Sequence, residues 1–161
     1  MLSLIRNEKI LIDRMGKDEV INLYSLWFSE GGRPTYTAWR KLDAQTRSSV
    51  LTYISYMEYI AEITAGGRKY FLAHTVPEYK EGVSLLDRCA DDFIFGEPDY
   101  EIEYLPDTYI VTGHTPTGLI DCHYKKRIWQ KNHHIAIDCG AAFGYPLGCI
   151  CLDTLEEFYV I

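Results

Sequence analysis

The sequence predicts a protein of mixed α and β structure, of the α+β or α/β class, with a helical first part followed by a mixed, largely antiparallel sheet. Apolar side chains recur at helical spacing through residues 1–65, whereas short runs of β-branched and aromatic residues fill 66–161. Glycine, proline and aspartate separate these runs, as they do at turns between strands. A length of 161 residues suits one domain, residues 1–161, with helices and strands in packed layers.

Helices are expected over most of the first part. Asp18 and Asp43 are good N-caps, because an aspartate side chain accepts hydrogen bonds from the first amides of a helix. The last helix is the longest, and its apolar stripe includes Ile60 and Ala61. Gly66–Gly67 then ends it. The expected helices span residues 1–15, 18–29, 35–42 and 44–64.

Two of the expected strands each end close to a histidine. One covers residues 68–74 and ends in His74, and the other covers 109–112, stops at Gly113 and leads to His114. Ligands gather at the carboxyl ends of strands in open α/β sheets. The two histidines are therefore candidate metal ligands or catalytic groups, provided that the strands are neighbours. A helix over 83–93 is expected between them. Further strands are expected over residues 127–130, 134–139, 147–152 and 158–161.

The charge and hydropathy of the chain exclude some classes of function. Sixteen basic residues against 23 acidic ones give a formal charge of −7, which argues against a broad nucleic-acid-binding face and against binding to an anionic membrane surface. Lys125–Arg127 is the only compact basic run, and it is expected to be a solvated turn. No apolar run has the length of a transmembrane helix, and the first residues lack the apolar core of a signal peptide. A cytoplasmic protein is therefore expected.

The five cysteines do not follow a metal-binding pattern. They are odd in number, show no repeated spacing and contain no Cys-x-x-Cys unit, which favours reduced core thiols. A small zinc protein built from clustered cysteines and histidines is an alternative. Its candidate ligands are Cys122, His123, His133, His134 and Cys139. His133 and His134 would point to opposite faces of a strand, so they are not expected to serve one metal.

Several segments resemble one protein family, and they follow its order. The Gly-His-Thr-Pro sequence of Gly113–Pro116 is similar to that of calcineurin-like metallophosphoesterases, above all the bacterial and phage serine/threonine phosphatases and the symmetrical dinucleoside-tetraphosphatases. The other similar segments are Trp27 with Gly31–Gly32 and Thr35, Phe71–Thr75, His134–Gly144 and Leu147–Asp153. Together they cover about residues 24–161. The resemblance implies the C-terminal half of a layered α/β/β/α sandwich.

The resemblance also implies a metal site. In this family two divalent metals clamp the phosphate of the substrate and supply the attacking hydroxide. His74 and His114 would be ligands of one of these metals, and imidazole suits Mn, Fe and Zn. Glu97 stands where relatives commonly have an arginine that holds phosphate. Arg33 and Arg88 are therefore the candidates to bind a phosphorylated substrate in its place.

Three motifs of the family's first half do not occur in the sequence. Met1 falls shortly after the point where the last of them would end, which suggests a truncated product or one piece of a split enzyme. These motifs supply the carboxylate ligands, so negligible phosphatase activity is expected of the chain alone. The lost strands would leave an open sheet edge, and a homo-oligomer or a pairing with the missing N-terminal half is expected. The alternative function is that of a non-catalytic half-domain used for self-association or protein interaction.

Overall fold

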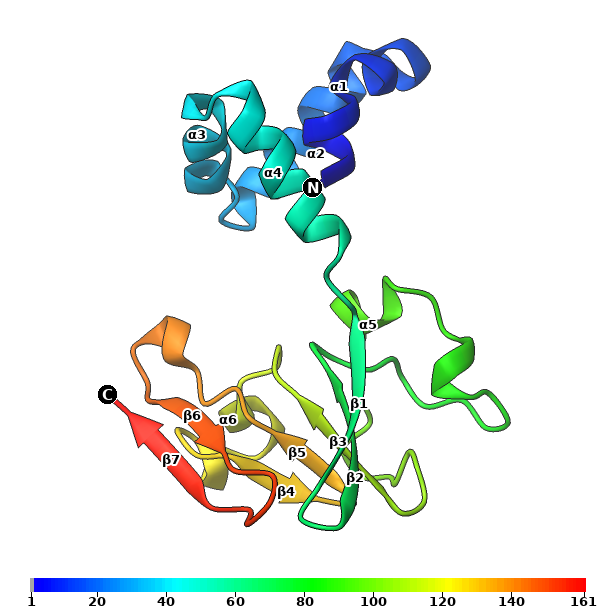
Figure 1. Ribbon diagram of the computed structural model, residues 1–161, viewed down its shortest axis with the longest axis vertical. Helices are drawn as coiled ribbons and strands as arrows, with labels where there is room; N and C mark the ends of the chain where they lie inside the picture. The colour runs from blue at the N-terminus through cyan, green and yellow to red at the C-terminus, as the bar shows by residue number, and fades with distance from the viewer. Residues whose placement is uncertain (1) are drawn as a thin grey trace. The chain divides into compact units, whose positions relative to one another are not determined.

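The computed structural model describes residues 2–161, which form two compact units (Figure 1). The N-terminal unit ends at Met57 and is helical, and the C-terminal unit, Glu58–Ile161, contains the strands. The helices of the first unit are α1 Leu2–Met15, α2 Lys17–Ser29, α3 Arg33–Lys41 and α4 Ala44–Ser55. The expectation of a helical first part followed by a mixed sheet is therefore confirmed. None of the described helices is both long and apolar enough to cross a bilayer.

An aromatic cluster joins α2 to α3. The rings of Tyr24, Trp27 and Phe28 lie 5.3, 6.1 and 5.4 Å from the ring of Tyr36, centre to centre. Between the two helices, a Cβ on Gly32 would lie 2.1 Å from the indole nitrogen of Trp27. Glycine is therefore required where the chain turns around this indole.

Of the two predicted helix N-caps, Asp43 is confirmed and Asp18 is wrong. Asp43 caps α4, since its Oδ1 accepts a hydrogen bond from the Thr46 amide at 2.8 Å. Asp18 does not cap α2, because that helix begins at Lys17 after Gly16. Asp18 instead lies in the first turn, where its negative charge favours the helix N-terminus.

The prediction of a helix to residue 64 was wrong. Helix α4 ends at Ser55, and β1 Ile60–Ala65 pairs antiparallel with β2 Arg68–Ala73. Gly66–Gly67 does not cap a helix but forms the turn of this hairpin, with φ of 53° and 75°. Two successive residues with positive φ match the twist of a tight hairpin, and β-branched side chains favour the strands that flank it.

The C-terminal unit is built on a five-stranded mixed sheet in the order β1-β2-β3-β5-β4. Strand β3, Thr108–Thr112, lies between β2 and β5, His134–Ala136, and pairs in parallel with both. The outer pairs are antiparallel, so the sheet is less antiparallel than expected. The remaining strands are β4 Trp129–Lys131 at one edge, and β6 Leu147–Ile150 with β7 Glu157–Val160 in a separate hairpin.

Short turns replace the helix that was expected between β2 and β3. Residues 83–93 contain only a 3-10 turn, Leu85–Asp87, and the start of the four-residue helix α5, Asp92–Phe95. The buried apolar side chains of this segment, Leu85 and Phe93, still pack against the sheet. Packing on the sheet thus fixes their positions without a long helix.

Successive residues of the central strands face opposite sides of the sheet, and each side has a core. Phe71 and Ile110 pack against the segment between β2 and β3. Tyr70 and Val111 lie on the other side, against residues of the β6–β7 hairpin and the turn between its strands. The hydroxyl of Tyr70 donates to the Leu152 carbonyl oxygen at 2.7 Å, which ties that turn to the sheet.

The hairpin turn gives a matched pair of stability variants. A Cβ on Gly66 would lie 2.2 Å from the Asp153 carbonyl oxygen, whereas a Cβ on Gly67 would meet nothing within 4 Å. Gly67→Ala should therefore lower the free energy of unfolding by only the backbone strain of a left-handed residue, roughly 1–2 kcal/mol. Gly66→Ala should cost that plus about 1–3 kcal/mol for the steric clash. Urea unfolding of the full chain measures both variants, and equal losses of stability would contradict this account.

Candidate metal centre

The carboxyl ends of three neighbouring strands meet at one edge of the sheet. His74 follows β2, His114 follows β3 after one glycine, and Asp138 follows β5 after one residue. Backbone hydrogen bonds continue past the strands, because Gly113 N donates to His74 O at 3.0 Å and Ile137 N to Thr112 O at 2.8 Å. The two histidine-bearing strands are thus neighbours, as the sequence analysis required.

The two histidine side chains converge. Nε2 of His74 lies 2.9 Å from Nδ1 of His114, so that one nitrogen donates a hydrogen bond and the other accepts it. The ring centres are 4.7 Å apart at 67°. Both side chains are exposed, which leaves them accessible to a ligand.

A tight turn directs His114 toward His74. His114 has a φ of 66°, and Thr115 N donates across it to Gly113 O at 2.7 Å. Such a three-residue turn with positive φ at its centre is rare and strained for a residue other than glycine. Backbone strain of this kind clusters at functional sites, where the surrounding structure holds it in place.

Asp138 is the residue of this edge that sequence reasoning did not assign to the site. Its Oδ1 accepts a hydrogen bond from Gly140 N at 2.8 Å. Partial burial and the neighbouring His114 lower the pKa of His74, and the Asp138 carboxylate offsets only part of this effect. His74 is therefore neutral at pH 7, which is the form that binds metal. The signal for Asp138 was its place in the Ile-Asp-x-Gly run, directly after a strand.

A buried polar network supports the end of β3. His134 is only 1% exposed, and its Nε2 lies 2.8 Å from Oγ1 of Thr112. Burial lowers the pKa of His134 to about 4, so its ring is neutral at physiological pH. The Tyr100 ring lies 4.9 Å from the imidazole, centre to centre. Within residues 2–161, neither Nδ1 of His134 nor the buried Tyr100 hydroxyl has a hydrogen-bond partner.

The two arginines suggested for phosphate binding have other contacts. Arg88 donates from Nη2 to the Glu78 carbonyl oxygen at 3.4 Å, in the connection between β2 and β3. Arg33 belongs to the N-terminal unit, where its guanidinium carbon lies 4.9 Å from the ring centre of Phe28. Their roles in phosphate binding stay predictions.

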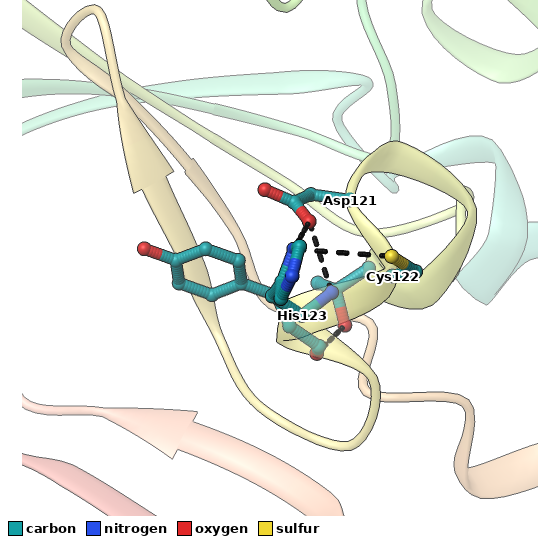
Figure 2. A network of polar contacts seen from close by, with 5 residues as sticks. Asp121, Cys122 and His123 are labelled. Carbon is teal, nitrogen blue, oxygen red and sulfur yellow. Dashed lines mark hydrogen bonds and ion pairs between the residues drawn. The ribbon is translucent and has the colours of Figure 1, made fainter.

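A second cluster of possible ligand atoms lies in one exposed turn (Figure 2). Asp121, Cys122 and His123 place one atom each within 4.8 Å of the others. The turn geometry accounts for this cluster, because Oδ1 of Asp121 caps a 3-10 turn by accepting from the His123 amide at 2.9 Å. The same oxygen lies 2.9 Å from Nδ1 of His123.

Of the residues of the zinc alternative, Cys122 and His123 come together in this turn, with Asp121. His133 bonds Glu103 at 3.0 Å while His134 bonds Thr112, so the two rings have separate partners, as expected. Cys139 is buried in the core. Of the other cysteines, Cys89, Cys122 and Cys149 are exposed and Cys151 is half-buried, so the prediction of core thiols holds only for Cys139.

The sequence matches no protein-family model and no curated protein. Two nitrogen ligands that each lie roughly 2.0–2.1 Å from one tetrahedral metal ion are themselves about 3.3 Å apart. The hydrogen-bonded histidine nitrogens, at 2.9 Å, would therefore separate by only a few tenths of an ångström when a metal ion replaced the shared proton. His74 and His114 thus fit as two ligands of one metal.

The buried histidine predicts a pH-dependent stability. In the unfolded chain His134 binds a proton near pH 6.5, whereas in the folded chain it does so only near pH 4. The contribution of the neutral His134 ring to the free energy of unfolding is therefore complete above pH 6.5 and is lost as the pH falls toward 4. The loss should amount to about 3 kcal/mol. Urea unfolding between pH 7 and 4 should show a shallower pH dependence for His134→Gln than for the wild type. His133→Gln is the matched control, and an unchanged dependence in His134→Gln would refute the assignment.

Proposed function

We propose that the chain belongs to a metallophosphoesterase lineage and that His74 and His114 supply two nitrogen ligands to one divalent metal, Mn, Fe or Zn. The function of the completed site is hydrolysis of a phosphate ester, of the serine/threonine phosphatase type or a related one. The observation that carries this proposal is the 2.9 Å separation of the two imidazole nitrogens, at the carboxyl ends of neighbouring parallel strands.

Three features support the proposal. Both histidines follow strands that the sheet holds side by side, where ligands commonly bind. The lowered pKa of His74 keeps its ring neutral and able to coordinate. Gly113–Pro116 and the strand before it resemble the family segment that carries such a histidine.

Two neutral imidazoles are only part of the ligand set of such a site. A bound metal pair would supply a hydroxide nucleophile and neutralise the charge of the phosphate. Carboxylates must then balance the charge of the metals, and we propose that another segment or another chain supplies them. Within this chain, Nε2 of His74 and Nδ1 of His114 share one hydrogen bond, and a metal ion would take the place of its proton. The Thr112–His134 contact lies at the end of the strand that precedes His114.

Metal analysis tests the proposal. The purified chain, after incubation with Mn, Fe or Zn, should retain metal, and both His74→Ala and His114→Ala should lose it. His123→Ala is the control, because His123 is 85% exposed and belongs to the other cluster of ligand atoms. Retention in both site variants, or loss only in His123→Ala, would reject the histidine pair as a metal site. The same preparation should hydrolyse p-nitrophenyl phosphate negligibly, since the carboxylates are not supplied.

A second candidate function is self-association through the edge of the sheet. Strand β1 pairs only with β2 among the described strands, and Ile63, at 42% exposure, lies on this edge strand. An open edge with exposed apolar side chains favours pairing with another strand. This observation supports a non-catalytic half-domain that forms homo-oligomers.

Sedimentation tests this candidate. The wild type should form oligomers at micromolar concentration, and Ile63→Lys should shift the population to the monomer, because an edge lysine disfavours strand pairing. Leu86→Lys is the control, because it replaces an apolar side chain that is 64% exposed in a 3-10 turn outside the sheet by the same charge. A wild type that stays monomeric throughout this range would count against edge pairing.

A further inference from the structure

A groove of about 470 Å³ is lined by residues that follow His114 and Asp138 closely in the sequence. Pro116 and Cys139 both line it, and they lie two residues after His114 and directly after Asp138. The Thr117 amide donates to the Asp138 carbonyl oxygen at 2.8 Å, which fixes the two segments against each other. This volume falls within the range of small-molecule sites.

The groove has an apolar wall that the described part of the chain leaves open. Leu119 and Phe143 line it, yet they are 79% and 72% exposed. Phe143 ends a 3-10 turn, Ala141–Phe143, which lies between Gly140 and Gly144, two glycines with positive φ. Large apolar side chains beside a hollow are suited to contact an apolar ligand.

The lining of the groove also includes two cationic side chains, Lys125 and Lys126. The ammonium groups of Lys125 and Lys126 lie 5.0 and 5.1 Å from the ring centre of Tyr145. A hydrogen bond from Lys125 lowers the pKa of the Tyr145 phenol. No carboxylate among the described residues forms an ion pair with either lysine, in a chain whose net charge is −7.

Two glycines allow this arrangement. A Cβ on Gly118 would lie 3.2 Å from Cβ and Cγ of Lys125, and a Cβ on Gly140 would lie 2.8 Å from the Tyr145 ring. The lysine stem and the tyrosine ring therefore pack directly on the backbone. Close backbone approach of this kind places both side chains at the groove.

We propose that this groove binds an aromatic phosphate monoester, with its ring against Leu119 and Phe143 and its phosphate beside Lys125 and Lys126. Two neighbouring ammonium groups match the double charge of a phosphate monoester better than a single negative charge. The apolar wall matches an aromatic body. None of the groove residues is a candidate ligand of the metal centre, so this binding goes beyond the proposed function and does not require metal.

Calorimetry of the full chain in the presence of a chelator tests the proposal. The probe 1-naphthyl phosphate should show saturable binding. Methyl phosphate, which lacks the aromatic ring, and 1-naphthol, which lacks the phosphate, should bind much more weakly. Lys125→Ala with Lys126→Ala should weaken binding by about tenfold. Phe143→Ala should weaken it by roughly fivefold.

Matched controls are available in the same unit. Phe95→Ala removes an aromatic side chain that is 73% exposed, and Lys69→Ala removes an exposed lysine, and neither residue lines the groove. Both controls should bind the probe as the wild type does. When 1-naphthyl phosphate is added to the wild type, the amide NMR signals of Gly118, Phe143 and Tyr145 should shift. This measurement does not require any variant to fold.

The proposal is overturned if 1-naphthyl phosphate does not bind, if methyl phosphate or 1-naphthol binds equally well, or if the shifts map elsewhere. Because the chelator is present, these results are independent of the metal analysis. A chain that binds the probe but no metal would support the groove and reject the metal centre. A chain that binds metal but not the probe would support the metal centre and reject the groove.

Discussion

The parallel pairing of β3 with β2 and β5 is the constraint on which the candidate site depends. Parallel strands bring their carboxyl ends to the same edge, so His74 and His114, forty residues apart in sequence, come within hydrogen-bonding distance. An antiparallel pairing would have placed the two histidines at opposite ends of the sheet. The same constraint brings Asp138 to this edge, together with Pro116 and Cys139, which line the groove.

The stability of this edge depends on polar groups under it. His134 pairs with Ile110 across the β3–β5 ladder and contacts Thr112, the last residue of β3. This buried imidazole therefore contacts the strand two residues before the turn at His114, whose φ is 66°. The strain at His114 is sustained because the strand before it and the turn after it are both held by hydrogen bonds.

Local signals in the sequence predicted part of this fold. The Asp43 cap and the helical spacing identified the helices of the first unit, because capping and amphipathicity act over a few residues. Residues 60–64 were assigned to a helix because their apolar positions continue the preceding helical pattern. Pairing with β2 overrode that pattern, and the Gly66–Gly67 turn was the available signal for a hairpin.

The site was predictable only in part. The histidines at strand ends were identified, but their separation depends on strand order, which a single sequence does not encode locally. Asp138 lies within the segment His134–Gly144, which resembles the family, but it was not assigned to the site. The lysines of the groove were interpreted as a solvated turn, because Tyr145 is brought beside them only by the fold.

The central claim is that Nε2 of His74 and Nδ1 of His114 converge on one metal ion. Long-range proton–nitrogen NMR of the labelled imidazole rings, during titration with Zn²⁺, observes each ring nitrogen separately. The account predicts that these two nitrogens shift together to metal-bound values at one equivalent, while the nitrogens of His123, His133 and His134 keep their positions. A shift at His123 instead, or at only one nitrogen of the pair, would contradict it.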